Sequence, residues 1–63
     1  MIRIIDVDLG WIKSYDISGI VPRIGETLVL QDHPHHGSYL VKEVKMYLSR
    51  SIHAIDLTVK KLN

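Results

Sequence analysis

The chain is predicted to fold as one small all-β domain over residues 1–63, a strongly bent antiparallel sheet or barrel of four to five strands. Short runs rich in β-branched residues alternate between apolar and polar positions, which is the period of a strand. Glycine and proline residues separate these runs by short links, and short links favour antiparallel pairing over parallel crossovers. A sheet this small hides its edges by closing into a barrel or by pairing with another copy.

The first strand is expected within residues 2–9, which end at Gly10. One face of this strand carries the apolar residues Ile5, Val7 and Leu9. The other face carries two carboxylates, Asp6 and Asp8, after Ile2 and Ile4. Because successive strand residues point to opposite sides, we expect the two aspartates to mark the solvent side, with no third acid beside them to complete a cation or acid–base site.

Residues 10–25 are predicted to form a loop with a short extended piece near Ile12. Pro22 lacks a backbone donor and fixes its own φ, so a central strand cannot run through it. The stretch "PRIGE" is typical of a turn that leads into a strand, which we expect at residues 26–31.

Residues 39–48 carry their apolar side chains on two different parities. Tyr39 and Val41 share one parity, whereas Val44, Met46 and Leu48 share the other. A bulge near Lys42 and Glu43 would bring both sets to one side, because an extra residue shifts the alternation. The alternative is a short helix near residues 40–49, which would make the fold α+β. A polar tip and a clearly alternating strand, residues 52–62, close the chain.

Composition excludes several classes of protein. The chain has no cysteine, so disulfides and thiolate metal sites are absent. Its net charge of +1 demands no strongly charged partner. No apolar run reaches the ~20 residues of a membrane span, and the N-terminus lacks the features of a signal peptide. We therefore expect a cytoplasmic protein without cofactor or membrane partner. Its small core would be stabilised by oligomerisation, by a histidine or carboxylate metal site, or by close packing alone.

The turn and strands of residues 20–62 resemble a pattern found in small bacterial and phage proteins. The pattern joins a Pro-x-x-Gly-Glu turn, here Pro22 to Glu26, to a Tyr-x-Val-x-x-Val strand, here Tyr39 to Val44. The resemblance implies a bent barrel of the Src-homology-three type with a binding role, and no catalytic residues. The long segment 10–19 and the histidine loop depart from the pattern.

The stretch "DHPHHG" holds three histidines, His33, His35 and His36, and these are weak candidates for metal ligands. A metal site needs three ligands with supporting partners, and the rest of the chain shows no ligand cluster. We therefore predict a solvated loop and no metal site. The chain shows neither a nucleophile–base constellation nor a phosphate-binding loop, so we expect it not to be an enzyme.

Several strands carry apolar residues on both faces, which predicts a second buried surface. We expect a non-catalytic, protein-binding accessory module that forms a homodimer, encoded by a phage and able to occlude a host defence protein. Alternatively, the segment 10–19 covers the surplus apolar residues. A single-stranded nucleic-acid binder is the second function considered, because aromatic and basic residues are present. The candidate binding residues are Trp11, Tyr15, Tyr39, Tyr47, Arg23 and Lys45.

Overall fold

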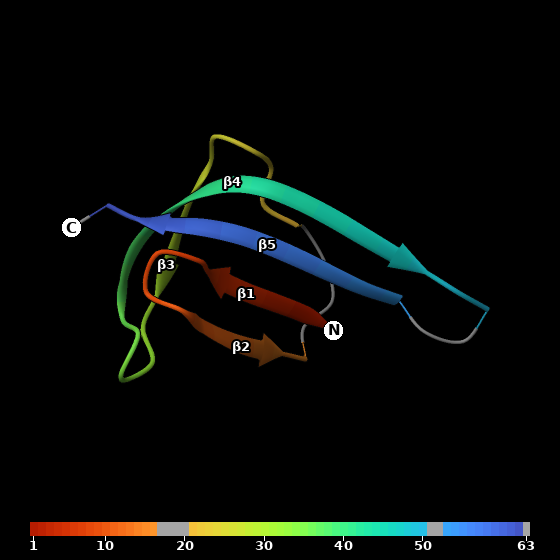
Figure 1. Cartoon of the computed structure of the whole chain (residues 1–63), viewed down its shortest axis with the longest axis horizontal. Helices are drawn as coiled ribbons and strands as arrows, with labels where there is room; N and C mark the ends of the chain where they lie inside the picture. Colours follow the sequence, from red (N-terminus) through yellow and green to blue (C-terminus); the bar gives the residue numbers. More distant parts are fainter. Residues whose placement is uncertain (17–20, 51–52, 63) are drawn as a thin grey trace.

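The computed structural model describes residues 1–16, 21–50 and 53–62. The strands are β1 (Ile2–Asp6), β2 (Trp11–Tyr15), β3 (Thr27–Leu30), β4 (Gly37–Leu48) and β5 (His53–Lys61). They form one five-stranded sheet in the order β2-β1-β5-β4-β3, which curls into a half-barrel (Figure 1). The described residues contain no helix, so the all-β prediction is confirmed and the α+β alternative is wrong. A membrane-spanning helix is accordingly not found in this part of the chain.

The sheet is mixed, not antiparallel throughout as predicted. β1 runs parallel to β5, whereas the other neighbouring pairs are antiparallel. Short links favour antiparallel pairing only between strands that follow each other in the chain. β1 and β5 are the first and last strands, so the whole intervening chain serves as their crossover and the parallel arrangement becomes available.

The buried face of β1 is the opposite of the predicted one. Ile2 and Ile4 point into the concave side and are buried, while Val7 and Leu9 are exposed. The reason is that the strand ends at Asp6, so Val7 and Leu9 lie in the turn and do not extend the alternation.

Asp6 is buried and organises that turn, which corrects its expected place on the solvent side. Its Oδ1 accepts hydrogen bonds from the backbone N–H groups of Asp8 and Leu9, both at 3.1 Å. Its carbonyl accepts a third from the N–H of Gly10 at 2.7 Å. An aspartate that bonds to the backbone two and three residues ahead nucleates a turn, and Gly10 completes it with a φ of 78°.

The predicted bulge in β4 is confirmed. The register with β5 shifts between Val41 and Glu43, so the extra residue is Lys42. Tyr39 and Val41 before the bulge and Val44 after it therefore all face the concave side, where the first two are fully buried. The core consists of Ile2, Ile4, Leu30, Tyr39, Val41, Leu57 and Val59.

The turn before β3 is also confirmed and is fastened to β4. The N–H of Arg23 donates to the Glu26 carboxylate, and the N–H of Glu26 donates to the Arg23 carbonyl at 3.0 Å. Two further backbone bonds join Gly25 and Glu26 to Val41, at 2.9 and 3.0 Å. β3 itself pairs with residues 37–40 of β4, so the neighbour of β4 on this side ends at Val41.

Beyond Ile2, which pairs with Ile55, β4 and β5 continue as a two-stranded arm formed by residues 47–48 and 53–54, which reaches past the start of β1 (Figure 1). The molecule is elongated, 38 × 23 × 21 Å. It exposes 4685 Å² of surface for a mass of 7.2 kDa, whereas a compact monomer of this mass exposes about 4,100 Å². The arm and the open side of the half-barrel thus leave more surface in water than the chain length requires.

Candidate interaction surface

Side chains close one end of the half-barrel, where the edge strands β2 and β3 approach each other without pairing. His35 stacks on the indole of Trp11, with ring centroids 4.0 Å apart and planes inclined by 14°. Tyr39 meets the same indole edge-on at 5.7 Å and donates its hydroxyl to the His35 carbonyl at 2.7 Å. Lys13 adds an ion pair to Asp32 at 3.5 Å. The loop after β3 is thereby held against β2.

This packing decides what the predicted aromatic residues can do. Tyr39 is a core residue with 1% of its surface exposed, so its ring is not available to a partner. Burial also raises the pKa of its phenol above the ordinary value of 10.0. Trp11 is half-buried and one face of its indole is covered by His35. The Tyr39 ring therefore offers no stacking face to a single-stranded nucleic acid, and on Trp11 one of the two indole faces is already occupied.

The histidine loop does not gather its side chains around one point. His35 turns toward Trp11, whereas His33 and His36 meet each other with ring centroids 4.6 Å apart. In the described part of the chain, no group of three or more His, Asp or Glu side chains is placed to hold a metal ion. His35 thus packs against the body of the protein, whereas the rings of His33 and His36 remain exposed.

The remaining candidates are dispersed over the molecule. Tyr15 lies at the end of β2 with the Lys13 ammonium 5.5 Å from its ring centroid. Tyr47 lies on β4, where it is exposed. Lys45 forms an ion pair with Glu43 at 3.4 Å, and Arg23 lines an apolar groove described below. The structure therefore does not unite the six predicted residues in one site.

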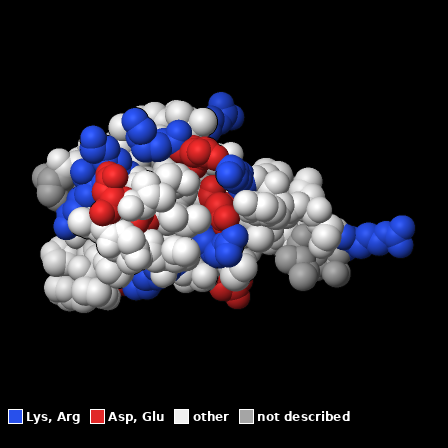
Figure 2. All heavy atoms as spheres, in the orientation of Figure 1, with Lys and Arg blue, Asp and Glu red and all other residues white. Residues whose placement is uncertain are grey.

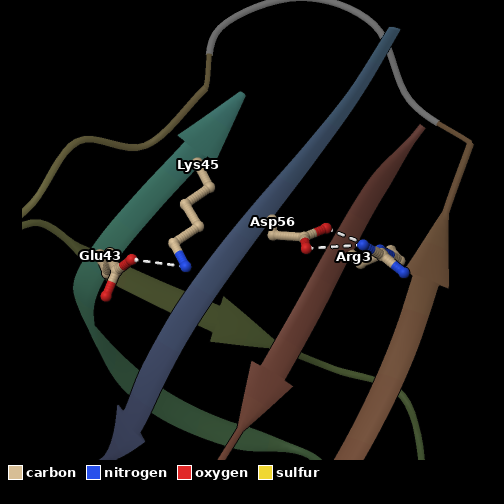
Figure 3. A network of polar contacts seen from close by, with 4 residues as sticks. All are labelled: Arg3, Glu43, Lys45 and Asp56. Atoms are coloured by element: carbon tan, nitrogen blue, oxygen red, sulfur yellow. Dashed lines mark hydrogen bonds and ion pairs between the residues drawn. The ribbon is translucent and has the colours of Figure 1, made fainter. Parts of the chain in front are cut away.

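The convex face of the sheet carries a polar row across three strands (Figure 3). Asp56 of β5 lies opposite Arg3 of β1 and opposite Lys45 of β4 in the strand registers. The Arg3 guanidinium donates two hydrogen bonds to the Asp56 carboxylate, both at 2.6 Å, and these bonds raise the pKa of Arg3. Bidentate pairs of this kind fix strand register, and we assign this row a structural role.

The concave side carries an apolar groove of about 510 Å³ between the segment before β3 and the middle of β4. Its lining is Val21, Pro22, Arg23, Ile24, Val44 and Met46. Pro22 also borders a second cavity of about 260 Å³, which reaches the core residues Ile2, Ile4 and Leu57. The open side of the half-barrel is thus hollow and mostly apolar, and among the described residues that line the groove only Arg23 is charged.

Large apolar side chains surround this groove and continue along the arm. Ile24 and Met46 of the groove are 65% and 60% exposed, and Leu48 on the arm is 68% exposed. Figure 2 shows basic and acidic side chains interleaved over the body of the molecule, while the arm is uncharged along most of its length. We call the surface formed by residues 21–24, Val44, Met46 and Leu48 the concave apolar surface.

Sequence reasoning found this surplus of apolar residues but named other residues, Trp11 and Tyr15 among them, as the candidates for binding. The anchors that the structure exposes are Ile24, Met46 and Leu48. The signal for two of them was present, because Met46 and Leu48 continue the apolar parity of Val44 toward a strand end. Nothing local to the sequence shows that β3 and the turn before it reach along β4 only as far as Val41.

Comparison with known proteins adds no relative: no family model, no curated protein and no solved structure matches the chain.

Proposed function

We propose that the chain is a non-catalytic protein-binding module that acts through the concave apolar surface, and that it associates with a second copy of itself. The observation that carries the proposal is the exposure of Ile24, Met46 and Leu48 around a groove of about 510 Å³. Exposed apolar side chains that line one hollow are typical of an interaction site, and a small core gains stability from a partner.

The excess surface supports self-association on quantitative grounds. A stable interface covers about 800 Å² on each partner, and the chain exposes 4685 Å² where about 4,100 Å² suffices for its mass. Covering the arm and groove would bring the surface close to that of a compact protein. Occlusion of a host protein stays a prediction, and so does binding of single-stranded nucleic acid, which the covered indole face disfavours.

Sedimentation equilibrium across a wide dilution series tests the proposal, together with thermal unfolding at each concentration. We expect a dimer whose melting temperature falls on dilution, because association stabilises the folded state by mass action. Leu48→Ser should weaken this dimer. Ile12→Ser is the matched control, because Ile12 is 63% exposed on the opposite edge strand. A monomer at every concentration, with one melting temperature, would contradict self-association.

A further inference from the structure

We infer that two copies associate edge to edge through β4, in antiparallel register with Met46 opposite Met46 of the second copy. This inference rests on the self-association proposed above and assigns its geometry. It makes the two half-barrels share one continuous sheet and places Leu48 of each copy in the groove of the other.

The first support is an open strand edge. β4 runs from Gly37 to Leu48, but its outer neighbours reach only Val41, through β3 and the turn at residues 25–26. No backbone hydrogen bond joins the outer edge of residues 43–48 to any other described segment. An open edge with apolar side chains is a template for a further strand.

The pairing of β4 with β5 shows which backbone groups of β4 point to the open edge. The N–H of Ile55 donates to the Met1 carbonyl at 3.1 Å, so the polar groups of Ile55 face β1 and not β4. Met46 is the register partner of Ile55, and their pair is therefore a non-hydrogen-bonded one. The N–H and C=O of Met46 consequently point to the open edge, and by alternation so do those of Val44 and Leu48.

Only one antiparallel register uses all three outward-facing residues. With Met46 opposite its copy, Val44 lies opposite Leu48 of the second copy on both sides of the axis. Each such pair exchanges two hydrogen bonds, about six in all. If the strands shift so that Lys45 lies opposite its copy, like charges face each other. This register also has one hydrogen-bonded residue pair fewer. Shifting them to Val44 brings Glu43 opposite Lys45 of the second copy, but leaves Leu48 without a partner and runs into the Lys42 bulge.

The chosen register also fills the groove. Opposite residues in a sheet point to the same face, and Val44 and Met46 line the groove on the concave side. Leu48 of the second copy, placed opposite Val44, therefore enters the space between β4 and the segment 21–24. On the convex side, Lys45 lies opposite Tyr47 of the second copy, which opposes no like charges. The interface thus buries Met46 and Leu48, which are 60% and 68% exposed in the single chain.

Single-cysteine cross-linking tests the register directly, because the chain has no cysteine of its own. Opposite residues of a hydrogen-bonded pair have Cα atoms about 5.5 Å apart, within the roughly 4.4–6.8 Å that a disulfide spans. M46C should therefore form a disulfide-linked dimer roughly tenfold or more faster than K45C, whose Cα atoms would lie about 8 Å apart two residues out of step. Both positions are exposed, so neither substitution threatens the fold.

Amide hydrogen exchange of the unmodified chain gives an independent readout. The amides of Val44, Met46 and Leu48 should exchange rapidly in dilute solution and slow down when the protein is concentrated. The alternate amides of Lys45 and Tyr47, which face β5, should be slow at both concentrations. This contrast within one strand is specific to pairing at the β4 edge.

The outcomes separate the inference from the proposal on which it rests. Preferred cross-linking of M46C with concentration-dependent protection of the three amides supports the β4 pairing. A dimer in sedimentation that cross-links fastest through K45C or V44C, or that leaves these amides unprotected, overturns the pairing while self-association stands. A chain that stays monomeric at every concentration removes both.

Discussion

Truncation of Leu57 is the sharpest test of where the core lies. Leu57 is 1% exposed at the centre of β5, opposite Ile4 and Val44 in the two neighbouring strands. Leu57→Ala is expected to lower the free energy of unfolding by about 3 kcal/mol, near the middle of the roughly 2–5 kcal/mol that such truncations cost. The cavity of about 260 Å³ beside Leu57 keeps the cost from the upper end, because part of the leucine surface already lacks neighbours.

A loss of this size is a large fraction of the total. A domain of 63 residues has a stability of roughly 3–9 kcal/mol. Urea unfolding followed by the fluorescence of the single tryptophan measures it. With an m-value of about 1 kcal/mol per molar urea, the midpoint should fall by about 3 M. Leu57→Val provides a milder variant if the alanine variant is unfolded from the start.

The matched control is Leu48→Ala, the same change at a side chain that is 68% exposed. Measured at a dilution where the chain is monomeric, it should cost less than about 0.5 kcal/mol. Equal midpoints for Leu57→Ala and Leu48→Ala would refute the placement of the core on the concave side of β5.

Three further expectations concern local chemistry. Burial raises the pKa of Tyr39, so the folded state resists ionisation of this phenol. The free energy of unfolding should therefore fall as the pH rises above the ordinary pKa of 10.0. Tyr39→Phe should flatten this alkaline decline when urea midpoints are measured against pH, and an unchanged profile would contradict the expectation. Asp6→Ala should cost about 1–3 kcal/mol through the lost turn acceptor, whereas Asp6→Asn, which keeps a carbonyl oxygen, should retain most of the stability in the same assay. Gly37→Ala should destabilise the chain by about 1 kcal/mol or more in thermal melts, because Gly37 has a φ of +145° and an added Cβ would lie 3.1 Å from Lys61 Cε. An unchanged melting temperature would contradict this strain at the start of β4.

Much of the local structure could be predicted because it depends on neighbours in the chain. Three such features each depend on only a few residues. They are the glycine and the glutamate of the "PRIGE" turn, the alternation of β5, and the change of apolar parity that required a bulge near Lys42. Their geometry is set by backbone sterics and side-chain period. The turn, the strand and the bulge were accordingly confirmed. The pairing of β1 with β5 was not foreseen, since it joins residues more than fifty positions apart, such as Arg3 and Asp56.

The sequence by itself determined that this chain forms short strands with a surplus of apolar residues and no disulfide. Only the tertiary structure decided which face of each strand is inside and where the surplus lies. Ile2 and Ile4 are buried because they face the interior of the half-barrel, and Asp6 is buried because it shares that face of β1. Met46 and Leu48 remain in water because β3 and the turn before it reach along β4 only as far as Val41, and Leu48 also lies beyond the start of β1, where Ile2 pairs with Ile55. Burial is a property of what packs against a residue, and period alone cannot supply the length of a neighbouring strand.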